Sequence, residues 1–200
     1  MAKSQKDMVN LLSEGGIAIY YGPILSPEEA THFFVRLMNS LHWKQDEVTI
    51  FGKRHLTKRK TAWHGDEPFI YTYSNSTKIA EPWTKELREL RELVQKKTGT
   101  VFNSCLLNLY HSGEEGMSWH SDNEKELGPQ PVIASLSLGA ERKFSLKHRE
   151  NKTTVSIQLE HGSLLLMKGS TQENWLHSLP KTKKVKEPRI NLTFRNIVKI

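Results

Sequence analysis

The order of helix and strand signals constrains what this chain can fold into more than any other feature. Two helical patterns come first, over residues 26–41 and 82–97. Short apolar or alternating segments follow, separated by Gly, Pro, Asn or charged turns. These segments cover residues 101–110, 132–138, 142–148, 153–159, 163–168 and 189–198. Helices followed by a run of short strands predict an α+β domain in which helices buttress an antiparallel sandwich or jelly roll.

Local signals mark the ends of the helices. Ser26 can cap the first helix, Pro27 suits its first position, and Glu29 completes a capping box. The second helical pattern ends near Gly99, a residue type that is common just after a helix.

The chain shows no repeat, low-complexity tract or linker, so we expect a single domain over residues 1–200. Residues 42–75 differ from the rest, because they are basic and aromatic and have weak periodicity. We interpret them as a hairpin-and-loop excursion from the core.

Composition narrows the class of protein. No run of about 18 apolar residues occurs, so we expect no membrane span, and the first residues lack the apolar stretch of a signal peptide. A lone cysteine, Cys105, excludes an internal disulfide and a Cys-rich zinc module. We therefore expect a soluble protein of a reducing, intracellular compartment. Our further expectations are that it is monomeric, and that it is cytoplasmic if bacterial and nuclear if eukaryotic.

The positive charge is concentrated in two blocks. The net charge is +7, with +5 in residues 52–60 and +6 in residues 181–200, so the rest of the chain is mildly acidic. Such blocks favour a polyanionic partner such as nucleic acid. The alternative is that each block is a solvated face or a basic tail.

Three residues have the spacing of a metal site. His120 and Asp122 are separated by one residue, so on an extended segment their side chains project to the same side. His177 would complete a set of two imidazoles and one carboxylate. This set leaves coordination positions open and is the facial triad of non-haem Fe(II) oxygenases. Alternatively, His177 is a structural histidine beside Trp175.

The last strand segment has one polar and one apolar face. Its period of two places Ile190, Leu192 and Phe194 toward a core, and Arg189, Asn191, Thr193 and Arg195 on the other face. Two arginines at the ends of a polar face can grip a dicarboxylate, because a guanidinium pairs with a carboxylate through two parallel hydrogen bonds. The alternative is an outward-facing basic strand.

Asn108 and Tyr110 share one face of the segment over residues 101–110. They can hydrogen-bond an organic anion beside the metal, or they are ordinary strand residues.

These motifs together resemble the AlkB family of alkylation-repair dioxygenases, which use Fe(II) and 2-oxoglutarate. The resemblance covers about residues 15–198 and is strongest to the branch that contains the DNA-repairing AlkB homologues of animals. The segments that carry it are IFGKRH at 50–55, YTYS at 71–74, NLY at 108–110, the stretch from Trp119 to Glu126, ELGPQPVIASLSLGAERKF at 126–144, HGSLLLM at 161–167 and HSLPKTKKVKEPRINLTFR at 177–195.

The resemblance implies a double-stranded β-helix, or jelly-roll, core with a nucleotide-recognition lid over about residues 42–75. It implies that His120, Asp122 and His177 hold Fe(II), which also takes 2-oxoglutarate and O2. Arg189 would pair with the distal carboxylate of 2-oxoglutarate, and Arg195 would lie by the end nearer the metal. The residues that would complete the pocket are Asn108, Tyr110, Asn191 and Thr193.

The resemblance also implies how a flipped base is recognised. Tyr71 and Tyr73 match lid positions that stack on or hydrogen-bond the base, and Glu124 matches an acid that reads its exocyclic edge. Phe51 matches a residue that wedges into the duplex. Phosphate contacts would come from Lys53, Arg54 and the basic run at 58–60.

Two departures from the family pattern lie on the substrate side. Tyr73 stands where the duplex-repairing branch has Phe, and Asn123 stands where a second acid is frequent. Both leave the iron chemistry unchanged and bear on substrate preference.

The expected function is oxidative demethylation of N-alkylated bases such as 1-methyladenine and 3-methylcytosine in DNA, with etheno adducts as further candidates. Formaldehyde, succinate and CO2 would be released. The expected partner is alkylated nucleic acid, with DNA favoured over RNA. The alternatives are the same chemistry with RNA or a protein side chain as main substrate, or a nucleic-acid-binding module without catalysis.

Overall fold

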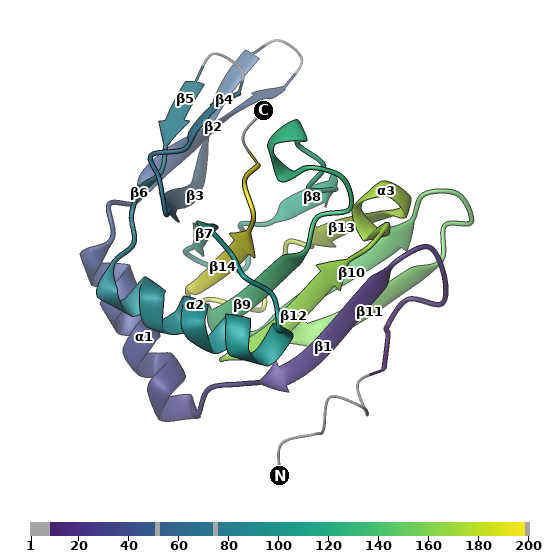
Figure 1. The fold of residues 1–200 in the computed structure, drawn as a ribbon, viewed down its shortest axis with the longest axis horizontal. Helices are drawn as coiled ribbons and strands as arrows, with labels where there is room; N and C mark the ends of the chain where they lie inside the picture. The colour runs from purple at the N-terminus through teal and green to yellow at the C-terminus, as the bar shows by residue number, and fades with distance from the viewer. Residues whose placement is uncertain (1–8, 51–52, 74–75, 199–200) are drawn as a thin grey trace.

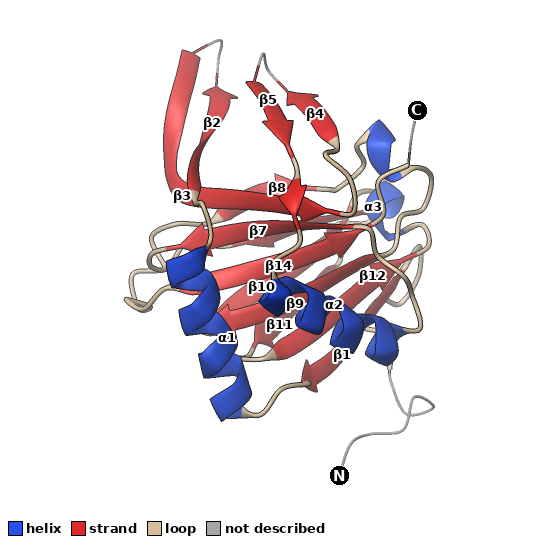
Figure 2. Cartoon of the chain, turned by 60° about the vertical axis from the view of Figure 1, so that its left-hand side comes forward, coloured by secondary structure: helices blue, strands red, loops and turns tan. Residues whose placement is uncertain are grey.

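The computed structural model describes residues 9–50, 53–73 and 76–198. Within these ranges, two antiparallel sheets pack face to face and two longer helices cover the outer face of the larger sheet (Figures 1 and 2). This arrangement confirms the α+β fold with a jelly-roll core. No helix in the described ranges is both long enough and apolar enough to span a bilayer.

The larger sheet places the last strand of the chain near its centre. Its order is β1 (Ile17–Pro23), β12 (Ser163–Lys168), β9 (Ile133–Gly139), β14 (Arg189–Arg195), β7 (Ser104–Tyr110), β3 (Lys53–Gly65) and β2 (Lys44–Ile50), with β6 (Glu81–Pro82) parallel to β3. The smaller sheet has the order β11 (Thr154–Leu159), β10 (Arg142–His148), β13 (Trp175–Leu179) and β8 (Met117–His120).

The register of β14 separates polar from apolar side chains. Asn191 is paired with Asn108 of β7 and Ser137 of β9, and the next residue, Leu192, is paired with leucines of the same two strands. Because paired residues point to the same face, the sheet around β14 is polar on one face and apolar on the other. The apolar face of β14 packs in the main core, as the alternation predicts.

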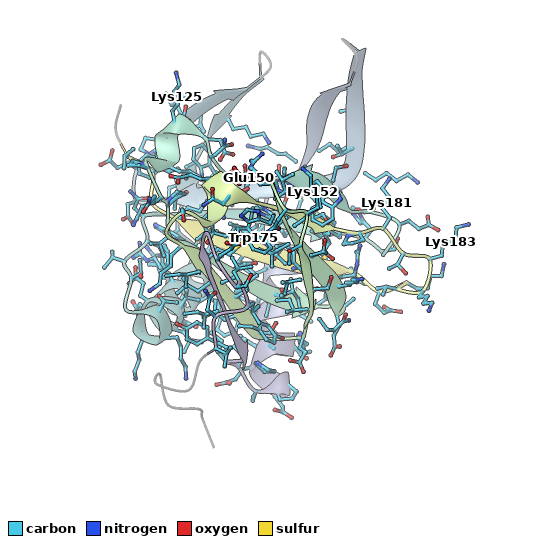
Figure 3. The ribbon with its side chains drawn as sticks, turned by 90° about the vertical axis from the view of Figure 1, so that its right-hand side faces the viewer. Lys125, Glu150, Lys152, Trp175, Lys181 and Lys183 are labelled. Atoms are coloured by element: carbon cyan, nitrogen blue, oxygen red, sulfur yellow. The ribbon has the colours of Figure 1, made fainter. Side chains whose placement is uncertain are left out.

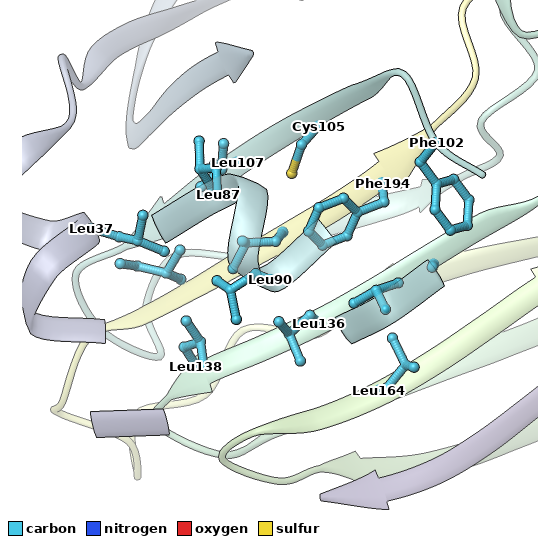
Figure 4. Packing of buried hydrophobic residues seen from close by; sticks show 14 of the residues in the cluster. Leu37, Leu87, Leu90, Phe102, Cys105, Leu107, Leu136, Leu138, Leu164 and Phe194 are labelled. Carbon is cyan, nitrogen blue, oxygen red and sulfur yellow. The ribbon is translucent and has the colours of Figure 1, made fainter. Parts of the chain in front are cut away.

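The helices α1 (Pro27–Ser40) and α2 (Lys85–Thr98) bury this apolar face (Figure 4). Leu37 of α1, Leu87 and Leu90 of α2, and Leu136 and Phe194 of the sheet are fully buried in one cluster. Burial of this kind contributes about 1.5–3 kcal/mol for each large apolar side chain.

The helix signals are mostly confirmed. The Ser26 side chain accepts the Glu29 N–H and the Glu29 carboxylate accepts the Ser26 N–H, so the capping box is complete. The second helix, however, begins at Lys85 and not at position 82. Thr84 caps it, and the preceding Pro82 belongs to β6.

The sequence prediction did not include β1, β5 (Ser76–Ile79), β6, β8 or β13. β8 is an edge strand of the smaller sheet and β13 is its inner neighbour, while β1 is an edge strand of the larger sheet. α3 (Thr171–Asn174) and a 3-10 turn, η2 (Lys125–Leu127), were also not predicted.

The excursion predicted over residues 42–75 consists of two antiparallel hairpins and extends to Ile79. β2 pairs with β3, and β4 (Ile70–Tyr73) pairs with β5 (Ser76–Ile79). Both hairpins project beyond the packed sheets (Figure 2). Since the second half of β3 pairs with β7, the first hairpin is a continuation of the larger sheet.

Candidate functional site

The predicted metal ligands meet at one edge of the smaller sheet. His120 ends β8, and its register partner is His177 of β13. The Oδ1 atom of Asp122, just beyond β8, lies 3.6 Å from His120 Nε2 and 3.7 Å from His177 Nε2. One ligand atom from each residue lies within 4.8 Å of the others. The three side chains therefore present their donor atoms to a single point.

Hydrogen bonding prepares these ligands for a cation. His120 Nδ1 lies 2.8 Å from the Ser118 carbonyl oxygen. A carbonyl only accepts, so Nδ1 carries the proton and Nε2 keeps its lone pair for a metal. The ring of Phe144 stacks on His177 with ring centres 5.5 Å apart, which restricts the orientation of the second imidazole.

The charges of the ligands also suit a divalent cation. Burial lowers the pKa of His120, and the neighbouring His177 lowers it further. Burial alone would raise the pKa of the Asp122 carboxyl, but hydrogen bonding and charge from His177, with the charge of Arg195, hold it well below its usual range. At neutral pH the cluster thus offers a carboxylate and a neutral His120 imidazole, the donor types that an Fe(II) facial triad uses.

A buried cation lies in the same cavity. Arg189 is 2% exposed, and its Nη2 donates to Ser137 Oγ at 2.9 Å and to Asn191 Oδ1 at 2.7 Å. Burial lowers the pKa of Arg189 to about 10, so the guanidinium is still charged at neutral pH. Its Nε has no hydrogen-bond partner, and no carboxylate of the described residues forms an ion pair with it. Arg189 is therefore ready to bind an anion.

The cavity between Arg189 and the metal ligands is lined by the predicted polar residues. Asn191 accepts from Ser135 Oγ and donates to Thr193 Oγ1, at 2.9 and 2.8 Å. The volume of the cavity, about 160 Å³, is far larger than the space that one water molecule needs. The predicted residues on its wall are Asn108, Tyr110, His120, Asp122, Glu124, His177, Arg189, Asn191, Thr193 and Arg195.

Arg195 lies at the metal end of this cavity. Its charge lowers the pKa of Asp122, and its Nη1 lies 3.9 Å from Glu124 Oε1. Burial raises the pKa of Glu124, and its buried Oε2 has no hydrogen-bond partner. Arg189 and Arg195 thus occupy opposite ends of the polar strand face, as predicted.

A second cavity adjoins the first on the side of the hairpin formed by β4 and β5. It shares Leu106, Glu124 and Arg195 with the first cavity, and its other walls include Ile70 of β4 and Lys78 of β5. The two cavities therefore form a continuous path from the three candidate metal ligands to the hairpin of β4 and β5.

The structure describes less of the predicted substrate side. Phe51 lies outside the described residues. Lys53, Arg54, Tyr71 and Tyr73 belong to β3 and β4, but their side chains lie outside what the structure describes.

The prediction that the whole basic run at 58–60 is available for phosphate is wrong for Arg59. Arg59 is buried, and its Nη1 contacts Met117 Sδ on the cavity wall. Lys58 is exposed, because alternate residues of a strand face opposite sides.

The chain is similar to known proteins over most of its length. The 2OG-Fe(II) oxygenase superfamily profile matches residues 17–195. "Alpha-ketoglutarate-dependent dioxygenase alkB homolog 3" of Homo sapiens is 39% identical over 90% of this chain and 66% of its own length. "DNA oxidative demethylase ALKBH2" of Mus musculus is 38% identical over 92% of this chain and 81% of its own length. The chain belongs to the AlkB family.

This AlkB-family chain is an Fe(II)- and 2-oxoglutarate-dependent dioxygenase, and not a binding module without catalysis. It spans about two thirds of the length of the human relative. A similar fold is found in a solved structure titled "The structure of OsALKBH1", with a TM-score of 0.65 and 15% identity over 92% of this chain and 99% of that chain.

Several residues at this AlkB-family site could not be identified from the sequence pattern or were overlooked in it. Ser135 and Ser137 alternate with buried apolar residues in β9, and that alternation could have placed them beside Asn191. Gln172, whose side chain bonds to the Asp122 backbone, lies in a one-turn helix and gives no periodic signal.

Proposed function

We propose that this enzyme removes alkyl groups from base nitrogens of nucleic acid, with 1-methyladenine and 3-methylcytosine in DNA as its main substrates. The observation that carries the proposal is the pair of adjoining cavities. One is lined by the three metal-ligand residues and by the Arg189 guanidinium, and the other reaches the hairpin of β4 and β5. A relative is named as a DNA oxidative demethylase, which supports the same substrate class.

In this proposal His120, Asp122 and His177 would hold Fe(II). The ion supplies, together with 2-oxoglutarate and O2, the oxidising chemistry that hydroxylates the alkyl carbon. Loss of that carbon as an aldehyde then leaves the unmodified base. No side chain of the protein needs to act as a nucleophile.

The chain positions 2-oxoglutarate through the polar face of the larger sheet. Arg189 binds the distal carboxylate through charge-assisted hydrogen bonds, with its guanidinium oriented by Ser137 and Asn191. Arg195 lies at the metal end. The residues that complete the pocket are Asn108, Tyr110 and Thr193.

The lid and Glu124 select the base. Glu124 lies where both cavities meet, and its unpartnered oxygen can accept a hydrogen bond from an exocyclic amino group. Tyr71 and Tyr73 of β4 would stack on the flipped base. Phe51 would fill the gap in a duplex, and Lys53 and Arg54 would contact phosphates.

The test uses the protein with Fe(II), ascorbate, 2-oxoglutarate and oligonucleotides that carry one 1-methyladenine. Mass spectrometry should show loss of the methyl group from the oligonucleotide, and Asp122→Ala should abolish it. Matched single-stranded DNA, duplex DNA and RNA define the preference. If RNA is turned over faster than DNA, then RNA and not DNA is the main substrate. An unchanged mass in every nucleic acid, despite steady 2-oxoglutarate turnover, would overturn the proposal.

A further inference from the structure

The carboxylate ligand Asp122 is held by a residue from a distant part of the chain. Asp122 lies beyond the end of β8, so no strand partner fixes its backbone. Its N–H donates instead to Oε1 of Gln172 at 3.0 Å. Gln172 lies in α3 and is 2% exposed. This is a partly buried hydrogen bond between two segments that are far apart in sequence.

The orientation of the Gln172 amide follows from its two neighbours. The Asp122 N–H requires an acceptor, so the oxygen of the amide faces it. The amide nitrogen, Nε2, lies 3.8 Å from Met167 Sδ, a weak acceptor, and Met167 lines the metal cavity. Both ends of the amide therefore have a partner, which restricts the side chain to one position.

The helix that carries Gln172 is itself fixed to the N-terminal segment. Thr171 Oγ1 accepts the Ile17 N–H at 2.9 Å and lies 2.6 Å from the Lys168 carbonyl oxygen, to which it donates. Asn174 Nδ2 donates to the Gly15 carbonyl at 3.1 Å. Trp175, which follows α3 and is labelled in Figure 3, donates from Nε1 to the Glu14 carbonyl at 3.0 Å. α3 is therefore a rigid support beside the cavity.

We propose that Gln172 is a positioning residue for the metal centre, acting through the Asp122 backbone. By fixing the Asp122 N–H it fixes the direction of the carboxylate, whose Oδ1 must stay near both imidazoles. Partners of metal ligands typically change metal affinity by about 10- to 100-fold when they are removed. This inference rests on the metal ligands named in the proposed function.

The experiment titrates the metal-free protein with Mn(II), followed by electron paramagnetic resonance. Wild-type protein should bind Mn(II) and Asp122→Ala should not, which tests the ligand set separately. Gln172→Met preserves side-chain length but replaces the oxygen acceptor with a weak one. Its Mn(II) dissociation constant should rise about 10- to 100-fold.

A matched control exists elsewhere in the chain. Gln95 Oε1 accepts the Phe102 N–H at 2.9 Å, outside both cavities. Gln95→Met removes the same kind of bond, so it should lower the thermal unfolding midpoint and leave Mn(II) affinity unchanged. Gln172→Glu retains an oxygen acceptor and should bind Mn(II) at least as tightly as wild type.

Three results would overturn the proposal. The first is a Gln172→Met protein that binds Mn(II) within about twofold of wild type, when about 10-fold is the smallest expected effect. The second is equal loss of affinity in Gln95→Met, since the effect would then be general destabilisation. The third is a folded Gln172→Glu protein that has lost Mn(II) affinity, a result that decides the question even if Gln172→Met does not fold.

Discussion

Arg189 keeps its positive charge in a buried place because neutral acceptors surround it. Ser137 and Asn191 accept its hydrogen bonds without cancelling the charge. The Tyr110 ring centre lies 5.6 Å from the guanidinium carbon. A charge held by neutral groups is unfavourable until an anion arrives, so we expect cosubstrate binding to depend strongly on this residue.

Arg189→Lys should raise the KM for 2-oxoglutarate by about 10- to 100-fold, since an ammonium group cannot form the two parallel hydrogen bonds of a guanidinium. Initial rates over a range of 2-oxoglutarate concentrations measure this effect. Arg88→Lys, an exposed change on α2, is the control and should leave the KM unchanged. Equal KM values for the two variants would show that Arg189 does not bind the cosubstrate.

At the level of single residues, the sequence predicts the candidate metal ligands better than the residues that position them. His120, Asp122 and His177 could be predicted from their spacing and their resemblance to a family. Gln172 could not, because its role comes from a contact across 50 residues of chain. Arg59 was misjudged because the neighbours that bury it come from another strand.

The pairing of β3 with β6 contains a buried histidine that should make stability depend on pH. His64 Nδ1 lies 2.8 Å from the Pro82 carbonyl oxygen, and burial lowers the pKa of His64 below its usual value. The unfolded chain therefore binds more protons between the two pKa values. Stability contributed by neutral His64 is present above the unfolded pKa, near 6.5, and is lost as pH falls toward the folded pKa.

His64→Asn preserves a donor for Pro82 and removes this titration. Urea unfolding at pH 7.5 and pH 5.5 compares the two proteins, with wild type expected to lose more stability on acidification. The difference has an upper limit of about 1.4 kcal/mol per pH unit. Other histidines with lowered pKa, such as His161, contribute equally to both proteins and cancel. Parallel pH dependence would contradict the role of His64.

The hairpin of β4 and β5 exposes apolar side chains that contribute little to the core. Ile70 is 66% exposed and Ile79, its cross-strand partner, is 55% exposed. Ile70 also lines the second cavity. An apolar side chain left in water at the rim of a cavity is suited to contact a ligand.

Ile70→Ser should change the free energy of unfolding by less than about 0.5 kcal/mol. It should raise the KM for a methylated oligonucleotide several-fold while the KM for 2-oxoglutarate stays constant. Val35→Ser, an exposed apolar change on α1, is the matched control and should alter neither KM. If Ile70→Ser turned over the oligonucleotide like wild type, the second cavity would not bind substrate.

Elements with strong local signals were predicted and those without were not. The capping box of α1 and the alternation of β14 act within a few residues. β13 is nearly all buried, so it lacks the alternation that marks a strand with one exposed face. β8 has only four residues and pairs with β13 through an irregular register.

Across the whole molecule, the basic excess is divided between interior and surface. Arg59, Arg189 and Arg195 are buried around the cavity. Lys181 and Lys183 are exposed on the segment between β13 and β14 and point outward in Figure 3. The net charge of +7 therefore overstates the charge that is available to bind phosphates.

Cys105 offers a probe of the whole fold. It is the single cysteine of the chain, it is fully buried in the main core, and burial raises the pKa of its thiol. We expect a thiol reagent to modify it only as fast as the protein unfolds, and more slowly when metal and 2-oxoglutarate bind the folded state. Val101→Cys, at a 72% exposed position, should react at once. Fast reaction of Cys105 in native protein would show that the core opens locally.

The hairpin of β4 and β5 has a consequence for how such an enzyme diversifies. Its strands pair with each other, whereas His120, His177 and Arg189 belong to the two packed sheets and Asp122 follows directly after β8. If the proposed function holds, mutations in this hairpin alter the preferred base at little cost in folding stability. The reaction centre thus lies in the part of the chain that tolerates change least, and the hairpin of β4 and β5, which tolerates it best, is where substrate range can evolve.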